Sequence, residues 1–296
     1  MSSKPKSSCA KFILLGEHSI VHKGIALSIP LPNLRLAIEI LDEKQGLFFN
    51  GLPQHEEKRL LLSQLSEKLN IEIPTNVGIN IVSDIPIGSG LGSSGALCCS
   101  LIKTFHAEEL SPNDLANLAI KGEDYFHGKS SGVDPFTIAL ERPIAFSSQN
   151  HEYKELSLEA LHEGGIGFFI VDSQSPHSTS EIIKATSDLR QRDPNKWQNC
   201  IDALAGFATE GKKAIDQSKI LELGRIMNDA HEVLRDYGVS NSVLDELVKK
   251  MRDNGALGAK MTGAGKGGSV IALLSQTKLQ EFTDLFARTK TFSYFP

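Results

Sequence analysis

The chain has 296 residues, a formal net charge of −5 and 40% hydrophobic residues. This length suits one large domain or two fused lobes, and this composition is ordinary for a globular protein. The small negative charge argues against a nucleic-acid partner, because binding a phosphate backbone needs a surplus of lysine and arginine on one face. An anionic small molecule is still permitted, since a few local cations can outweigh the overall sign.

The N-terminal segment is not expected to act as a secretion or membrane signal. Its apolar run covers only residues 12–15 before Gly16 and Glu17 end it. A secretory signal needs about 7–15 apolar residues and a membrane helix about 20. The four cysteines show no CxxC spacing, which favours buried or incidental thiols in a reducing compartment. We therefore expect no membrane partner and a cytoplasmic location.

The residue patterns predict strands early in the chain and mostly helices later. Alternating apolar residues predict strands at 34–41 and 77–86, and other strands are predicted at 11–16, 26–31, near 144, at 165–173 and at 269–274. Apolar residues at helical spacing predict helices at 55–69, 94–105, 111–128, 178–191, 195–217, 219–236, 240–253 and 277–288. This order predicts an α+β protein with two lobes, residues 1–155 and 156–296, joined near the polar stretch 147–163.

The glycine-rich segment PIGSGLGSSGAL, residues 86–97, is the strongest functional signal. Its glycines let backbone N–H groups turn inward, and a predicted helix begins directly afterwards. Free N–H donors and the helix dipole favour a bound phosphate, whereas the alternative is a flexible turn. The Walker pattern GxxxxGK[ST] is absent, and the GxGxxG match lacks the strand and acidic residue of a dinucleotide-binding site. We therefore predict phosphate binding by residues Gly88, Ser89, Gly90, Leu91, Gly92, Ser93 and Ser94.

Two carboxylates are prominent in GEDYFHGKSSGVDPF, residues 122–136. Glu123 falls on the apolar stripe of its predicted helix, so it projects inward and needs a cation or a buried partner. Asp134 is placed in a Ser- and Gly-rich loop, and Pro135 favours an extended backbone there. A carboxylate in such a loop can act as a general base, although it can also be an ordinary turn residue.

Two further segments, one near each end of the chain, carry polar residues or glycines of interest. Lys11 enters the first predicted strand, and Glu17 and His18 follow that strand directly. A lone lysine at a strand edge is usually solvated. The segment MTGAGKGGSVIAL, residues 261–273, predicts a second tight approach of the backbone.

The order of these segments resembles the superfamily of galactokinase, homoserine kinase, mevalonate kinase and phosphomevalonate kinase. Its members share an N-terminal lysine strand, a central GLGSS loop and a C-terminal GAGxGG loop. Within it, KFILLGEHSIVHKGIAL and HGKSSGVD are similar to the mevalonate kinase branch. The resemblance implies a two-lobed small-molecule kinase with a ribosomal-S5-like N-terminal lobe and a ferredoxin-like C-terminal lobe.

The resemblance also implies roles for individual residues. Asp134 would be the catalytic base with Lys11 as its cationic partner, and Ser94 and Glu123 would hold Mg²⁺ of an ATP complex. The substrate, mevalonate, would be bound by Glu17, His18, Thr179, Gly263 and Ala264. Members of the mevalonate kinase branch are often homodimers, so a homodimer is one expected assembly.

Several positions depart from the pattern of this superfamily, among them a mild change to Ser89 and Gly95 from the commoner alanines. Lys266 stands where relatives usually have glycine, so its loop either bends differently or gains a cation. His177 stands where many relatives have arginine, which leaves the choice of substrate open.

The resemblance therefore implies ATP-dependent phosphorylation of the primary hydroxyl of mevalonate. A phosphomevalonate kinase, a mevalonate 3-kinase, a sugar kinase and a non-catalytic ATP-binding sensor are the alternatives.

Overall fold

The computed structural model describes residues 5–22, 24–42, 44–175 and 179–296. The chain divides into two compact units by contact. The first unit comprises residues 1–11, 30–87 and 92–142, and the second comprises residues 12–29, 88–91 and 143–296. Strands β1 (Lys6–Leu15) and β2 (Ile25–Leu41) pair with each other and continue from one unit into the other. The units therefore do not follow one cut in the chain, and the lobe boundary after residue 155 stays a prediction.

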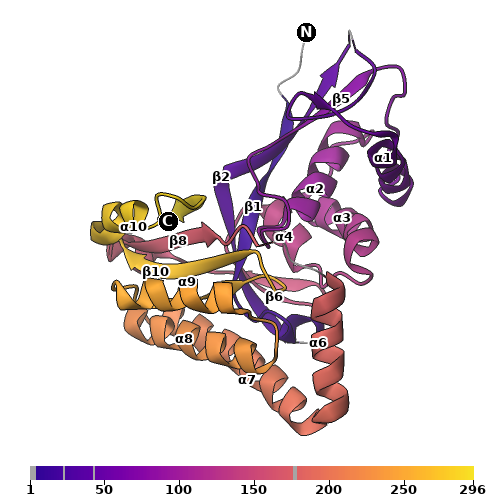
Figure 1. The fold of residues 1–296 in the computed structure, drawn as a ribbon. Helices are drawn as coiled ribbons and strands as arrows, with labels where there is room; N and C mark the ends of the chain where they lie inside the picture. Colours follow the sequence, from indigo (N-terminus) through magenta and orange to yellow (C-terminus); the bar gives the residue numbers. More distant parts are fainter. Residues whose placement is uncertain (1–4, 23, 43, 176–178) are drawn as a thin grey trace. The chain divides into compact units, whose positions relative to one another are not determined.

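The first unit combines a sheet with a group of helices (Figure 1). The end of β2 pairs antiparallel with β5, β5 pairs parallel with β3, and β3 pairs antiparallel with β4. Helix α2 contacts both α3 and α4, so these helices form one packed group. The elements are β3 (Gly46–Phe49), β4 (Leu52–Pro53), α1 (Glu56–Lys68), β5 (Gly78–Ser83), α2 (Ser93–Phe105), α3 (Pro112–His127) and α4 (Val133–Leu140).

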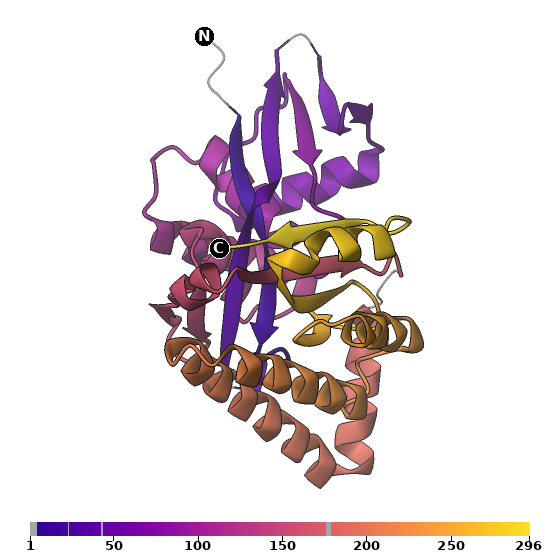
Figure 2. The ribbon, with the colours of Figure 1, turned by 90° about the vertical axis from the view of Figure 1, so that its left-hand side faces the viewer.

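The second unit contains an antiparallel sheet of strand order β11-β8-β10-β9. Helices α8 and α9 pack on β9, and α7 lies beside α8 (Figure 2). The start of β2 also pairs with β6 and β6 with β7 in this unit. Its strands are β6 (Ile144–Ser147), β7 (Glu152–Glu155), β8 (Ile166–Asp172), β9 (Gly258–Thr262), β10 (Ser269–Ser275) and β11 (Thr291–Tyr294).

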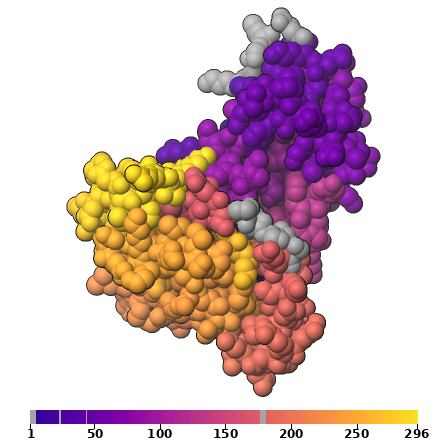
Figure 3. Space-filling model, in the orientation of Figure 1, coloured from indigo at the N-terminus to yellow at the C-terminus, as the bar shows by residue number. Residues whose placement is uncertain are grey.

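The helices of the second unit complete its core. They are η1 (Ser19–His22), α5 (Glu159–Glu163), α6 (Thr179–Arg192), α7 (Pro194–Asp216), α8 (Ile220–Asp236), α9 (Ser242–Asp253), η2 (Gln276–Lys278) and α10 (Leu279–Leu285). Phe282 of α10 and Phe169 of β8 pack edge to face with ring centroids 5.5 Å apart inside this core. In the space-filling view, the orange surface of α8 and α9 adjoins the yellow C-terminal segment (Figure 3). None of the helices in the described part of the chain is long and apolar enough to cross a bilayer.

The predicted helices and most predicted strands are confirmed, with two differences. The strands predicted at 26–31 and 34–41 form one strand, β2. Pro30 and Pro32 interrupt the sequence pattern, but they fall between the stretches that pair with β6 and with β5. Their missing N–H donors therefore cost neither of these two ladders a hydrogen bond. Strands β3, β4, β7, β9 and β11 were not predicted, because all five have five residues or fewer and so carry too short a sequence pattern.

The second difference concerns the catalytic candidate Asp134, for which the prediction of an extended loop is wrong. Asp134 lies in the first turn of α4, after Gly132, whose φ is 86°. Pro135 is tolerated because N–H groups in the first turn of a helix have no intrahelical acceptor. Gly132 supplies the left-handed turn that lets the helix begin at Val133.

Candidate active site

The first unit brings together four of the residues that the sequence singles out. The Nζ atom of Lys11 lies 2.9 Å from Oδ1 of Asp134. A Cβ atom built on Gly95 would lie 3.5 Å from Cβ of Asp134 and 3.6 Å from Oε1 of Glu123. Since Gly95 follows Ser94 at the start of α2, both carboxylates lie at the N-terminus of that helix. We call Lys11, Ser94, Glu123 and Asp134 the α2 cluster.

The amine of Lys11 is placed by the close packing of β1 on the glycine loop. Lys11 is 2% exposed, whereas the side chain of Asp134 is 20% exposed. A Cβ atom on Gly92 would lie 2.9 Å from Cε of Lys11, and the φ of Gly92 is 78°. Any other residue at this position would collide with the lysine stem and strain the backbone. Glycine at 92 is therefore required by the position of Lys11 as well as by the turn.

Glu123 lies on the buried side of α3, as its place in the apolar stripe predicts. Its exposed fraction is 2%, and Oε1 has no hydrogen-bond partner among the described residues. Burial, followed by the charge of Asp134, raises the pKa of Glu123 from 4.5 to about 8, against a smaller lowering by a hydrogen bond with Ser94. A cation bound next to Glu123 would stabilise the ionised form of this buried carboxylate.

Sequence reasoning missed His127, which lies beside the same carboxylate. Its Nε2 atom is 3.3 Å from Oγ of Ser94 and 3.8 Å from Oε2 of Glu123. Glu123 and His127 are four residues apart on α3, so helical spacing would have placed both side chains on one face. That spacing is the sequence signal that could have found this histidine.

Helix α2 offers its first N–H groups to an anion. Its N-cap is Gly92, which has no side chain to accept from the first turn. The N–H groups of the first turn have no intrahelical acceptor, and the helix dipole adds a partial positive charge there. Ser93 and Ser94 begin the helix and add hydroxyl groups at the same end.

The other half of the predicted phosphate loop, residues 88–91, packs in the second unit. A Cβ atom on Gly90 would lie 3.0 Å from the carbonyl oxygen of Thr262, and one on Gly268 would lie 3.0 Å from that of Ser89. The segment after β9, which contains Gly263, therefore packs closely against the backbone of this loop. The sequence predicted such a tight approach in residues 261–273, and the structure confirms it.

The predicted substrate residues Glu17 and His18 also belong to the second unit, just after β1. Glu17 is buried and pairs with the amine of Lys260 on β9. His18 has a φ of 62°, and its Nε2 atom lies 3.0 Å from the carbonyl oxygen of Ala264. Gly263 and Ala264 follow β9 directly, whereas only the backbone of Thr179, at the start of α6, is described. His177 lies outside the described residues.

A cavity of about 320 Å³ opens beside the start of α2 in the first unit. Apolar side chains of β2, β3, β5, α1, α2 and α3 form most of its wall, with Ser93 and Ser94 at one side. No local sequence pattern predicts this cavity, because its lining is scattered over the chain. The lining consists of Leu36, Leu47, Phe49, Gln54, Lys58, Leu61, Leu62, Ile81, Ser83, Ile87, Ser93, Ser94, Leu97 and Phe126.

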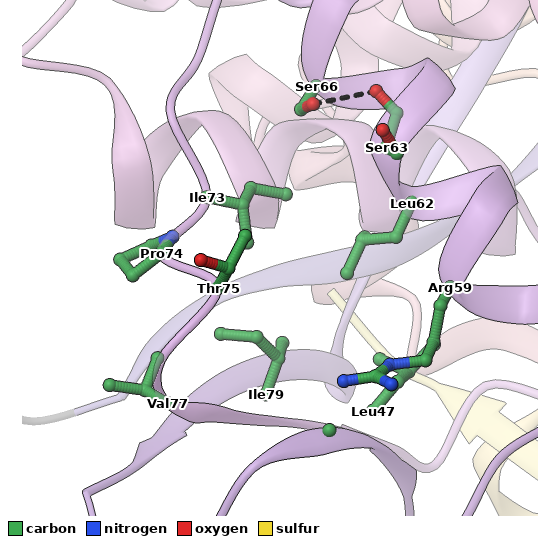
Figure 4. A pocket seen from close by; sticks show the side chains of 11 residues that line it. Leu47, Arg59, Leu62, Ser63, Ser66, Ile73, Pro74, Thr75, Val77 and Ile79 are labelled. Atoms are coloured by element: carbon green, nitrogen blue, oxygen red, sulfur yellow. Dashed lines mark hydrogen bonds between the residues drawn. The ribbon is translucent and has the colours of Figure 1, made fainter. Parts of the chain in front are cut away.

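A second cavity of about 220 Å³ lies on another side of α1 (Figure 4). It includes Arg59 and Thr75, and Ser66 donates to the carbonyl oxygen of Ser63 at its border, at 2.7 Å. None of the predicted site residues lines it, so we assign it no role in the reaction.

Family models match two regions of the chain. The model described as GHMP kinases N terminal domain matches residues 58–142, and the model described as GHMP kinases C terminal matches residues 212–284. The mevalonate kinase of Thermococcus sibiricus is 30% identical over 312 residues, which cover 94% of this chain and 91% of the relative.

Solved structures show the same fold. The structure of L. major mevalonate kinase in complex with R-mevalonate has a TM-score of 0.79 and 21% identity, and covers 99% of this chain and 98% of its own. The Methanococcus jannaschii mevalonate kinase has a TM-score of 0.78 and 25% identity, with 99% and 98% covered. The predicted two-lobed kinase fold is therefore confirmed.

Proposed function

Because the chain belongs to the GHMP kinase family, we propose that it is a mevalonate kinase, which transfers the γ-phosphoryl group of ATP to the primary hydroxyl of mevalonate. The product is 5-phosphomevalonate, an intermediate of isoprenoid biosynthesis. The similarity to mevalonate kinases over 94% of the chain supports this substrate.

The observation that carries the proposal is the contact between Lys11 and Asp134 at the N-terminus of α2. Phosphoryl transfer needs little covalent work from the protein, but it needs alignment and neutralisation of negative charge. A buried cation, a partly exposed carboxylate and a helix N-terminus within one packed group supply these requirements.

In the proposed mechanism, Asp134 accepts the proton of the primary hydroxyl of mevalonate as that oxygen attacks the γ-phosphorus. Lys11 keeps the Asp134 carboxylate in place and stabilises charge on the phosphoryl group that is transferred. The backbone N–H groups of residues 88–94 bind phosphate oxygens.

The residues of the cluster also fit Mg²⁺, which prefers oxygen ligands and keeps phosphate oxygens or water in its shell. Oε1 of Glu123 is buried without a hydrogen-bond partner in the described chain, and the hydroxyl of Ser94 is adjacent. No group of three His, Cys, Asp or Glu side chains that could hold a metal occurs among the described residues, so substrate oxygens would complete the shell. We propose that Ser94 and Glu123 hold the ion, which neutralises negative charge on the triphosphate when bound.

We propose that the 320 Å³ cavity beside α2 binds the adenine base. Its wall is apolar, as the faces of a purine require, and Gln54 and Ser83 offer hydrogen-bonding groups for its edge. Ser93 and Ser94 belong both to the cavity and to the phosphate loop, which supports one continuous nucleotide site.

For the substrate, we propose that Glu17, His18, Thr179, Gly263 and Ala264 contact mevalonate. The R-mevalonate complex of the L. major enzyme supports this class of ligand. The cytoplasmic location and the homodimer stay predictions.

A panel of substrates tests the proposal. The purified chain is given Mg²⁺ and ATP with mevalonate, phosphomevalonate or galactose in parallel, and release of ADP is measured. We expect turnover with mevalonate alone, and the product should carry its phosphate on the primary oxygen. Faster turnover of another acceptor would show that the chain is a related kinase of the same fold. Binding of ATP without turnover of any acceptor would indicate a non-catalytic ATP-binding sensor.

A further inference from the structure

Lys260 is a fully buried lysine that the proposed mechanism does not use. It lies in the middle of β9, where all five residues are buried, and its own exposed fraction is 0%. Its amine donates to the Glu17 carboxylate and, at 2.7 Å, to the carbonyl oxygen of Met261. Taking an ammonium group out of water is costly, so a lysine at this position needs the partner that Glu17 provides.

The neighbour of Glu17 is also held by the end of β9. Nε2 of His18 faces the carbonyl oxygen of Ala264 at 3.0 Å, and a carbonyl oxygen can only accept. Desolvation lowers the pKa of this half-buried histidine to about 4, so the ring is neutral at neutral pH. Nε2 therefore carries the proton, and Nδ1 is left as an acceptor. Both polar residues that follow β1 are thus fixed by β9 and the loop after it.

We propose that Lys260 is a positioning residue, which keeps the Glu17 carboxylate ionised and oriented as a hydrogen-bond acceptor for a hydroxyl of the substrate. This inference rests on the proposed function and deepens it. An ionised Glu17 repels the carboxylate end of mevalonate and accepts hydrogen bonds from its hydroxyl groups. The Nδ1 atom of His18 can also accept a hydrogen bond from such a hydroxyl group. Lys260 would therefore help to select which end of the substrate lies here, although it acts only through Glu17.

Among the described residues, the charged and titratable groups on the adjoining elements do not supply a competing switch near neutral pH. His231 of α8 accepts from the N–H of Met261 at 3.4 Å, and its Nε2 is 3.3 Å from Asp245 of α9. Burial, followed by the charge of Arg252, lowers the pKa of His231 to about 4. Burial also lowers the pKa of His22, on η1, below its ordinary value. With His18, these imidazoles are neutral in the neutral range, so a new ionisation step there would belong to Glu17.

The test is a cycle of three variants, Glu17→Gln, Lys260→Met and the double variant, assayed with mevalonate and ATP. Methionine keeps the length and the apolar stem of lysine and removes its charge. We expect Lys260→Met to raise the KM for mevalonate about 10- to 100-fold at neutral pH, with the KM for ATP unchanged. The loss should recover as pH rises, because a buried carboxylate without its cation has a raised pKa and ionises only at higher pH.

The double variant separates positioning from a purely structural role. It removes both charges of the pair, so it should fold even if Lys260→Met does not. Its KM for mevalonate should equal that of Glu17→Gln alone, and its profile should lack the pH step, because Lys260 acts only through Glu17. Additive effects on KM, or a loss in Lys260→Met that is equal for both substrates and independent of pH, would overturn the inference. Turnover of mevalonate by the unaltered chain is measured first, so a failure of the proposed function is recognised separately.

Discussion

Asp134 and Lys11 form the contact on which the proposed chemistry depends. Replacing Asp134 with asparagine keeps the shape of the side chain but removes the proton acceptor. We expect kcat to fall about 10²- to 10⁴-fold with little change in the KM of either substrate. Steady-state kinetics of Asp134→Asn check this result. Asp253→Asn, which changes an exposed ion pair on α9, is the control and should keep full turnover. A near-normal kcat of Asp134→Asn would contradict the proposal that Asp134 is the general base.

The raised pKa of Glu123 should make the free energy of unfolding depend on pH. Its pKa in the folded chain, about 8, lies above the ordinary 4.5, so folding favours its protonated form. The stability that this group contributes is fully present below the ordinary value and is lost as pH rises through about 8. Without divalent cations, we expect the Tm of the unaltered chain to fall across this window relative to that of Glu123→Gln, measured by calorimetry.

Added Mg²⁺ and ATP should reduce this fall in the unaltered chain but not in Glu123→Gln, because the ion favours the ionised carboxylate. Glu222→Gln changes an exposed carboxylate on α8 and should follow the unaltered chain. Parallel Tm curves for Glu123→Gln and the unaltered chain would contradict the assignment.

Lys266 adopts a backbone conformation that favours glycine. Its φ is 57°, and its N–H donates to the carbonyl oxygen of Val239 at 2.7 Å. A side chain in this region costs about 1–2 kcal/mol, which glycine avoids while it loses more freedom on folding. We expect Lys266→Gly to raise the free energy of unfolding by about 0.5–1 kcal/mol, measured by denaturant titration.

Lys266→Ala is the matched control, because it removes the same charge but keeps the strained backbone. Its stability should stay within about 0.5 kcal/mol of the unaltered chain. If Lys266→Gly is the less stable of the two variants, backbone strain at this position does not lower the stability of the unaltered chain.

At the scale of elements, helix α2 contributes to both the proposed phosphate loop and the proposed adenine pocket. Leu97 lines that pocket from α2, so a larger side chain there should occupy space needed by the base. We expect Leu97→Phe to raise the KM for ATP about 10-fold or more while the KM for mevalonate is unchanged. Leu60→Phe is the control, because Leu60 on α1 is 60% exposed and does not line the pocket. Equal ATP affinity in both variants would place the base elsewhere.

The helices also show which local signals were sufficient. Ser111 accepts from the N–H of Asp114 and Gly128 ends α3 with a φ of 74°, as the sequence predicts. These two ends set the bounds of α3, and Glu123 lies on its buried side. The start of α4 differs from the prediction, because the left-handed conformation of Gly132 allows a helix to begin despite the restriction that Pro135 imposes on Asp134. A local rule was overridden by the residue two positions earlier.

At the scale of the whole molecule, the four cysteines report on the integrity of both cores. Cys9, Cys98, Cys99 and Cys200 are free and buried. Burial raises the pKa of the Cys9 and Cys99 thiols to about 12, so their reactive thiolate forms are rare at neutral pH. We expect negligible reaction with a thiol-specific chromogenic reagent in the native chain and four reactive thiols in denaturant. Rapid native reaction of several thiols would contradict the packing described for these cores.

The sequence by itself determined the glycine loop, the inward carboxylate of Glu123, the helix pattern and the resemblance to a kinase family. The first three features are local, since each depends on residues that are close in the sequence, whereas the resemblance depends on the order of three segments along the chain. The resemblance implied that Lys11 is the partner of Asp134, and the tertiary structure shows the two in contact. Only the tertiary structure decided that Lys260 pairs with Glu17 and that a pocket opens beside α2. The partners are separated by 123 residues in the first pair and 243 in the second, and burial rather than sequence spacing sets their electrostatics. Long-range packing of strands and helices creates those contacts, and no local pattern encodes it.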